Sequence, residues 1–294
     1  MKPFEYLAPG SLKEALEMLN SYGGDAVVMA GGTDVIPLLS ERAISPRYVI
    51  HLDKLNELRY IKEEQGCIKI GPLVTVNELL ASDLIKNKLS ALWQAADASA
   101  APQVRNLGTI GGNLGTASPA GDLNIALAAL NAKVVAGNKT KTSEYAVEDF
   151  LTGTKKNVLS NNQIITEIVV PVLPANTKSS FRKIGTRKAM TISVANVAAV
   201  VTVDSTGKKI QNARVVFGSV APVPVVSKKY AGALAGTAFD SEAIRRLSSL
   251  VKEEISPITD MRATAEYRSE IAGVLAVRCV EDCLGCVQQG EVVS

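Results

Sequence analysis

Two glycine-rich stretches decide the fold of this chain: AGGTDVIPLL at residues 30 to 39 and TIGGNLGTASPAGDLN at residues 109 to 124. Glycine admits positive φ and has no Cβ, so clustered glycines can aim several backbone N–H groups at phosphate oxygens. A tight turn would explain Gly31-Gly32 equally well if that pair stood alone. Both stretches together favour one ligand that carries a pyrophosphate. The second continues through small and hydroxyl residues, which predicts an extended backbone around a ligand.

Neither stretch is a standard nucleotide motif. The sequence has no G-x-x-x-x-G-K-[ST], and the glycines from Gly108 to Gly115 do not form G-x-G-x-x-G between a strand and a helix. An ATPase or a Rossmann dehydrogenase is therefore disfavoured.

The surrounding pattern predicts strands followed by helices, which indicates an α+β fold. Ser11 and Glu14 have capping-box spacing and start a helix that ends at Gly23-Gly24, and 26–30 is a buried strand that leads into the first glycine stretch. Residues 101–122 show no strong period, Pro171 to Pro174 indicate a domain boundary, and 205–207 form a turn. The other predicted strands are 47–52, 68–71, 133–136, 139–146, 164–170, 180–187, 196–204 and 213–220, and the other helices are 76–80, 84–100, 122–130, 241–254 and 265–288.

Composition removes several classes of function. The 294 residues are 47% hydrophobic, which is enough for an apolar core. The net charge is only +3, which argues against a nucleic-acid-binding protein. A missing signal peptide and missing apolar span predict a soluble, cytoplasmic protein. The single histidine, His51, ends the apolar run RYVIH and is expected to be a satisfied strand-end residue. A chain so poor in acid–base catalysts indicates that a cofactor carries the chemistry.

The two glycine stretches resemble the FAD-binding medium subunit of the molybdenum hydroxylase family, which includes xanthine dehydrogenase and carbon monoxide dehydrogenase. The resemblance covers essentially the whole chain, since residues 181–200 (FRKIGTRKAMTISVANVAAV) resemble the start of the family's C-terminal flavoprotein domain and residues 267–278 (YRSEIAGVLAVR) its last helix. It implies a PCMH-type fold in residues 1–174, with two lobes at about 1–55 and 56–174 around FAD. A smaller α+β domain follows in 175–294.

The resemblance also implies roles for individual residues. Lys183 matches a lysine at the pyrimidine end of the flavin, where a cation stabilises the reduced anion. Ile192 matches a side chain that lies over the isoalloxazine ring and must shift for a nicotinamide to stack. Thr191 stands where many relatives carry an acid. The matching cofactor-binding residues are Ala30, Gly31, Gly32, Thr33 and Asp34 in the first stretch, and Thr109, Ile110, Gly111, Gly112, Asn113, Thr116 and Asp122 in the second, the last two nearer the ribityl chain and flavin.

Two polar features admit competing interpretations. Asp34 would repel a phosphate unless its carboxylate faces away or caps the next turn, so we interpret it as structural. Cys279, Cys283 and Cys286 have a spacing that could hold an iron–sulfur cluster, yet three thiols are one short of a four-cysteine set and Cys67 is far away. We therefore expect small buried side chains there and no metal site.

As a function, the resemblance implies an electron-transfer flavoprotein subunit. Electrons would pass from a molybdopterin large subunit through a [2Fe–2S] small subunit to this FAD and on to an acceptor such as NAD, within a dimer of heterotrimers. Two alternatives stay open. One is a self-contained PCMH-type flavin reductase or oxidase, which would need an acid or base near flavin N5. The other is a non-enzymatic FAD-binding protein, whose flavin NADH would not reduce.

Overall fold

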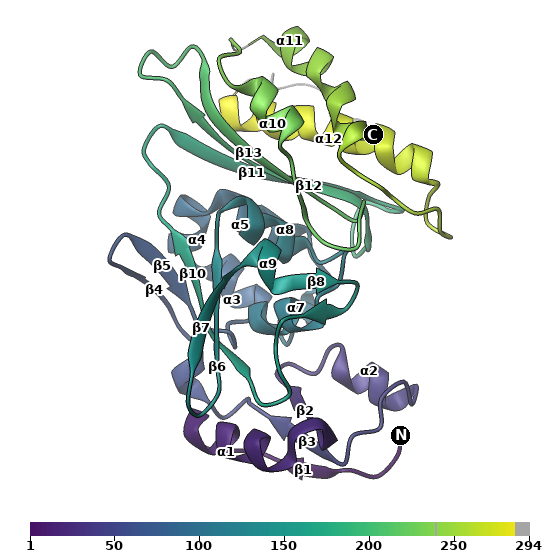
Figure 1. Ribbon diagram of the computed structural model, residues 1–294. Coiled ribbons are helices and arrows are strands. Elements are labelled where there is room, and N and C mark those ends of the chain that lie inside the picture. The colour runs from purple at the N-terminus through teal and green to yellow at the C-terminus, as the bar shows by residue number, and fades with distance from the viewer. Residues whose placement is uncertain (239, 286–294) are drawn as a thin grey trace.

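The computed structural model describes residues 1–238 and 240–285 and stacks them as three successive parts (Figure 1). A small N-terminal lobe lies at one end, a helix-rich central part with its own sheet lies in the middle, and a sheet covered by helices lies at the other end. Helices and strands alternate in an α+β arrangement, as the sequence predicts. No helix in this described portion reaches the length and apolar character that a bilayer-spanning segment needs.

The N-terminal lobe is a three-stranded parallel sheet in the order β1-β3-β2. The Ser11 hydroxyl accepts a hydrogen bond from the Glu14 N–H and starts the first helix. Leu19 of that helix is buried together with Ile50 of the central strand. The elements are β1 (Glu5–Leu7), α1 (Leu12–Tyr22), η1 (Gly23–Asp25), β2 (Ala26–Met29), α2 (Val35–Ser40) and β3 (Tyr48–His51).

The central part contains a five-stranded antiparallel sheet in the order β4-β5-β10-β6-β7, with helices packed against it around a large apolar core. Its strands are β4 (Ile61–Glu64), β5 (Cys67–Ile70), β6 (Lys133–Gly137), β7 (Thr142–Ala146) and β10 (Ile164–Pro171), with a separate pair β8 (Leu151–Gly153) and β9 (Lys156–Asn157). Its helices are η2 (Asn56–Leu58), α3 (Val76–Ala81), α4 (Asp83–Lys88), α5 (Ser90–Ala98), α6 (Pro102–Arg105), α7 (Ile110–Thr116), α8 (Asp122–Ala129) and α9 (Val147–Phe150).

The last part is a four-stranded antiparallel sheet in the order β11-β12-β13-β14 whose second strand is buried on both faces. Ala198 and Val200 pack into the central core, and Val197 and Ala199 pack into the core beneath the final helix. Alternate residues of this strand face opposite sides of the sheet, so the strand packs into both cores and fixes the C-terminal sheet against the central helices. The elements are β11 (Thr177–Gly185), β12 (Ser193–Val203), β13 (Ile210–Gly218), β14 (Val225–Val226), α10 (Lys229–Leu234), α11 (Ser241–Arg246), η3 (Leu247–Glu253) and α12 (Ala265–Leu284).

The prediction of an aperiodic, extended segment at 101–122 is wrong, because α6 and α7 lie there. The Thr109 hydroxyl caps α7 by accepting from the Gly112 N–H. At Gly111 a Cβ would lie 2.5 Å from Pro72 Cβ, so the helix packs closely against a neighbouring segment. Tertiary contact therefore outweighs the poor helix propensity of glycine here.

Several boundaries also differ from the prediction. The strand predicted at 139–146 begins at Thr142, because the Asn138 side chain accepts from the Thr140 and Lys141 N–H groups and closes a turn. The helix predicted at 84–100 is interrupted at Leu89, and the helix predicted at 241–254 continues as 3-10 turns after Arg246. α12 ends at Leu284 before a left-handed Gly285, and 286–288 lie outside the described residues. The elements β1, β4, β8, β9, β14, α2, α9 and α10 were missing from the prediction.

Candidate functional site

The first glycine stretch presents a run of backbone donors. β2 ends at Met29, and the following turn enters α2 with Gly32 at a φ of 73°. Within the described part of the chain, no atom accepts a hydrogen bond from the N–H groups of residues 31–34. Successive N–H groups around a left-handed residue form a concave anion site. The geometry of this turn therefore suits a phosphate.

His51 holds the start of that turn in place. Its Nε2 lies 3.0 Å from the Ala30 carbonyl oxygen and its Nδ1 lies 2.7 Å from the Tyr6 hydroxyl. A carbonyl can only accept, so Nε2 donates to it, and Nδ1 shares a second hydrogen bond with the tyrosine hydroxyl. Both ring nitrogens have partners, and the expectation of a satisfied strand-end histidine is confirmed.

The second glycine stretch differs from the first, because its leading N–H groups already have partners. Ile110 donates to the Val74 carbonyl, Gly111 to the Pro72 carbonyl and Gly112 to the Thr109 hydroxyl. Gly112 is also absent from the glycines with positive φ. These residues fix α7 against the chain near Pro72, so the N–H groups of residues 110–112 are occupied, whereas those of residues 31–34 have no acceptor among the described residues.

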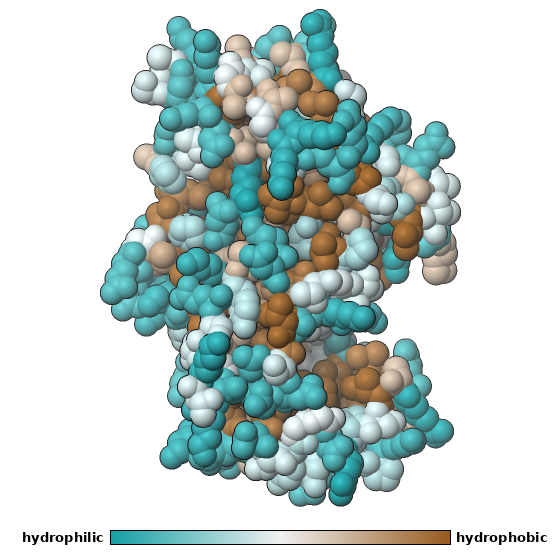
Figure 2. Space-filling view, viewed as in Figure 1, coloured by the Kyte–Doolittle hydropathy of each residue, from teal (hydrophilic) through white to brown (hydrophobic). Residues whose placement is uncertain are grey.

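The two stretches touch each other directly. A Cβ at Gly31 would lie 1.6 Å from the Leu107 carbonyl oxygen, so only glycine permits this approach. The Asp34 carboxylate accepts a hydrogen bond from the Thr116 hydroxyl at 3.2 Å and caps no helix. Figure 2 shows the surface indented between α2 and the part of the molecule that holds α7 and β8. The first stretch and the end of α7 thus lie on two sides of one indentation.

Buried amides without partners lie near the end of the second stretch. Asn113 Oδ1 and both side-chain amide atoms of Asn124 are buried and have no hydrogen-bond partner among the described residues. A Cβ at Gly121 would lie 3.2 Å from Asn113 Oδ1 and 2.7 Å from Asn124 Nδ2. Buried polar groups are rarely left unpaired, so these amides suit a polar ligand.

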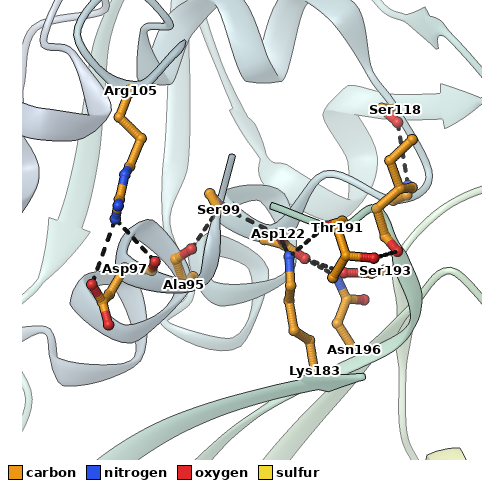
Figure 3. Close-up of polar contacts among 12 residues, drawn as sticks. Ala95, Asp97, Ser99, Arg105, Ser118, Asp122, Lys183, Thr191, Ser193 and Asn196 are labelled. Atoms are coloured by element: carbon orange, nitrogen blue, oxygen red, sulfur yellow. Dashed lines mark hydrogen bonds and ion pairs between the residues drawn. The ribbon is translucent and has the colours of Figure 1, made fainter. Parts of the chain in front are cut away.

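A charged network lies immediately after Gly121 (Figure 3). The Lys183 ammonium lies 2.7 Å from Asp122 Oδ2, and both side chains are more than nine-tenths buried. The carboxylate also accepts from the Ser193 hydroxyl at 2.6 Å, the Asn196 amide at 2.7 Å and the Ser99 hydroxyl at 3.3 Å. Asp122 therefore joins α8 to two strands of the C-terminal sheet.

Lys183 also connects this network to the loop after β11. Its ammonium donates to the Thr191 carbonyl at 3.0 Å. A Cβ at Gly185 would lie 2.1 Å from Thr191 Cγ2, so this glycine is needed where the loop returns. The neighbouring Ile192 side chain is 55% exposed although it is large and apolar. The structure thus brings Asp122, Lys183, Thr191 and Ile192 together.

Cys279 and Cys283 lie in the core between α12 and the sheet. The Cys279 thiol donates to the Ser180 carbonyl at 3.1 Å, and the Cys283 thiol lies 3.6 Å from the Ala199 carbonyl. Burial raises the pKa of the Cys279 thiol to about 12 and holds that of Cys283 well above its usual range. Both are therefore protonated, buried side chains; Cys286 lies outside the described residues. Of the residues that the structure describes, no three His, Cys, Asp or Glu form a group that could hold a metal ion.

Sequence reasoning missed Ser99, Ser193 and Asn196 as partners of Asp122. The signal for two of them was present, since Ser193 and Asn196 interrupt the apolar run ISVANVAAV. Polar residues in a strand buried on both faces need partners, and Asp122 provides one acceptor for both.

Comparisons with known protein families cover nearly the whole chain. Residues 2–173 match the family described as the FAD binding domain in molybdopterin dehydrogenase, and residues 180–283 match the CO dehydrogenase flavoprotein C-terminal domain. The chain belongs to the FAD-binding subunits of the molybdopterin dehydrogenases. FAD is accordingly the cofactor of this oxidoreductase subunit, and the family resemblance of the two glycine stretches is confirmed.

Individual relatives are similar along their full length. The FAD-binding subunit is 30% identical to the glyceraldehyde dehydrogenase medium chain of Sulfolobus acidocaldarius, covering 95% of this chain and 98% of that protein. It is 33% identical to the nicotinate dehydrogenase FAD-subunit of Eubacterium barkeri, covering 92% of each. Its structure matches a chain of carbon monoxide dehydrogenase from Hydrogenophaga pseudoflava with a TM-score of 0.92 and 30% identity, covering 98% and 100%.

Proposed function

We propose that this chain receives electrons from a [2Fe–2S] small subunit and passes them through FAD to an acceptor such as NAD. A molybdopterin large subunit would oxidise the substrate, and the assembly would be a dimer of heterotrimers. The names of the relatives support this, since they include a dehydrogenase medium chain and a CO dehydrogenase that contains copper and molybdenum. Free thiols at Cys67, Cys279 and Cys283 support a reducing, cytoplasmic setting.

The run of unpaired N–H groups at residues 31–34 is the observation that carries the proposal. These donors would hold the pyrophosphate. The cofactor-binding residues that the sequence predicts in the second stretch would line the opposite side of the same site. The unpaired amides of Asn113 and Asn124 would hydrogen-bond polar atoms of the cofactor. We also propose that the chain divides into two domains near Pro171 to Pro174, as the sequence predicts.

The residues around Lys183 would act on the flavin ring. Bound FAD supplies electron exchange in one- or two-electron steps. Lys183 would place a positive charge near the ring, with Asp122 holding the ammonium in position. Ile192 would cover the ring until an acceptor displaces it. Asp122 is occupied by four donors, so it is poorly placed to serve as the free base that a self-contained flavin enzyme would need.

Purification from the native source tests this proposal. The chain should be yellow, release FAD and not FMN, and co-elute with an iron–sulfur and a molybdopterin chain. By itself it should catalyse at most NADH-dependent dye reduction. Release of FMN alone would contradict the pyrophosphate assignment. Substrate hydroxylation by the isolated, metal-free chain would favour the self-contained flavin enzyme instead.

A further inference from the structure

A pocket of about 220 Å³ opens beside Ile192. It is lined by side chains of two segments, the loop after β11 and the turn before α12, namely Thr186, Arg187, Met190, Thr191, Ile192 and Arg262. Two of these six residues carry a guanidinium group and none is acidic. The pocket therefore favours an anion next to the predicted flavin face.

Arg187 shapes its own loop and keeps further donors available. Its Nε and Nη2 donate to the Met190 carbonyl at 3.1 Å and 2.5 Å. Met190 has a φ of 51°, a left-handed conformation that is unfavourable for a residue with a side chain. The two hydrogen bonds offset that cost and hold the loop closed. A guanidinium has five N–H groups, so Nη1 is left to donate elsewhere.

Arg262 is held in place by a buried neighbour. Its Nη1 lies 3.1 Å from Asp260, and the same carboxylate accepts from Arg268 Nη2 at 2.7 Å. Arg268 is 3% exposed and also donates to the carbonyls of Val194 and Ser219. Hydrogen bonds from the Arg262 backbone and from Arg268 lower the pKa of Asp260, so the anchor stays ionised. This chain of contacts fixes Arg262 to the strand that also carries Ser193.

We propose that Arg187 and Arg262 bind the pyrophosphate of a nicotinamide dinucleotide acceptor. The inference rests on the proposed function, because it takes NAD as the acceptor. Guanidinium groups pair with phosphate oxygens through two parallel hydrogen bonds, which fixes both position and orientation. The pocket is smaller than the roughly 300–1,000 Å³ of sites that enclose a whole small ligand, so it holds one part of the dinucleotide. Ile192 at its rim leaves the nicotinamide end beside the flavin.

The test uses the full-length, FAD-loaded chain with Arg187→Gln and Arg262→Gln. Anaerobic rapid mixing with NADH gives the Kd from the concentration dependence of flavin reduction, and reduced nicotinamide riboside serves as a probe without phosphate. Each substitution should raise the Kd for NADH at least tenfold and leave the riboside unchanged. FAD content should equal that of the wild type. The matched control is Arg246→Gln, which removes an exposed arginine paired with Glu242 on α11.

Different failures have different meanings. An unchanged Kd for NADH in both variants would overturn the pyrophosphate subsite and leave NAD as the acceptor. A wild-type flavin that NADH does not reduce would overturn the acceptor itself and this subsite with it. An equal rise of Kd for the riboside would show that the arginines act through the loop and would also overturn the proposal. Arg187 does not contact Asp260, so its variant tests the pocket even if Arg262→Gln folds poorly.

Discussion

Lys183 serves two purposes, one structural and one proposed. The side chains of Lys183 and Asp122 are 9% and 7% exposed, and each is the counter-ion of the other. Replacing the lysine with methionine leaves a buried carboxylate without its cation, which costs about 3–5 kcal/mol. We expect Lys183→Met to lose that much stability as the FAD-free chain in urea unfolding. If Lys183 lies near the ring, the two-electron potential of bound FAD should also fall in a spectroelectrochemical titration.

A second variant separates these two effects. Lys183→Met combined with Asp122→Asn removes both charges, so most of the stability should return while the potential stays low. A normal potential with weakened FAD binding would assign the lysine to the phosphates instead.

The sequence singled out Lys183 and Asp122 but could not pair them. Each was placed by its own local match, and their contact exists only because the sheet that contains β11 packs against α8 through β12 and β13. Local patterns also do not indicate that Ser99, at the end of α5, donates a hydrogen bond to Asp122. Contacts between distant segments depend on packing, which one sequence does not reveal.

At the scale of elements, α7 shows why a glycine-rich helix escapes prediction. Glycine costs about 1 kcal/mol in a helix relative to alanine, and Gly111, Gly112 and Gly115 lie within its seven residues. Long, periodic elements such as α1 and α12 were predicted because their own sequences specify them. A short helix that depends on a cap and on a neighbouring backbone carries no such period.

That dependence makes the cap of α7 a testable position. Thr109→Val keeps the shape of the side chain but removes the acceptor for the Gly112 N–H, which costs about 1 kcal/mol. We expect a matching loss in thermal or urea stability together with faster release of FAD. Ser11→Ala removes the corresponding cap of α1, away from the second stretch, and should cost similar stability while FAD is retained. Equal FAD loss in both variants would show that only global stability matters.

At the scale of the whole molecule, Gly31 is where the N-terminal lobe meets the central part. Any Cβ there collides with the Leu107 carbonyl, and a backbone atom cannot move aside as a side chain can. Gly31→Ala should therefore separate the two stretches and abolish FAD retention, measured as the absorbance ratio of flavin to protein. Gly232→Ala in α10 is the matched control, since its Cβ meets no atom within 4 Å. This control should keep FAD and gain about 0.5–1 kcal/mol.

A yellow Gly31→Ala protein would show that the two lobes can bind FAD without this contact. The family fold was predictable for the whole chain because the glycine stretches, residues 181–200 and the last helix all carried the resemblance. The contact between Gly31 and Leu107 was not predictable, because it joins two distant segments and neither local sequence indicates which segment packs against it.

The burial of Cys279 and Cys283 has a consequence for the chemistry that this chain hosts. Reduced flavins react with dioxygen, and the hydrogen peroxide formed attacks thiolates far faster than thiols. With a pKa near 12 and no solvent contact, the Cys279 sulfur offers almost no thiolate, and Cys283 shares its surroundings. The two thiols packed against the sheet that bears Lys183 are thus shielded from oxidants generated by the subunit's own cofactor.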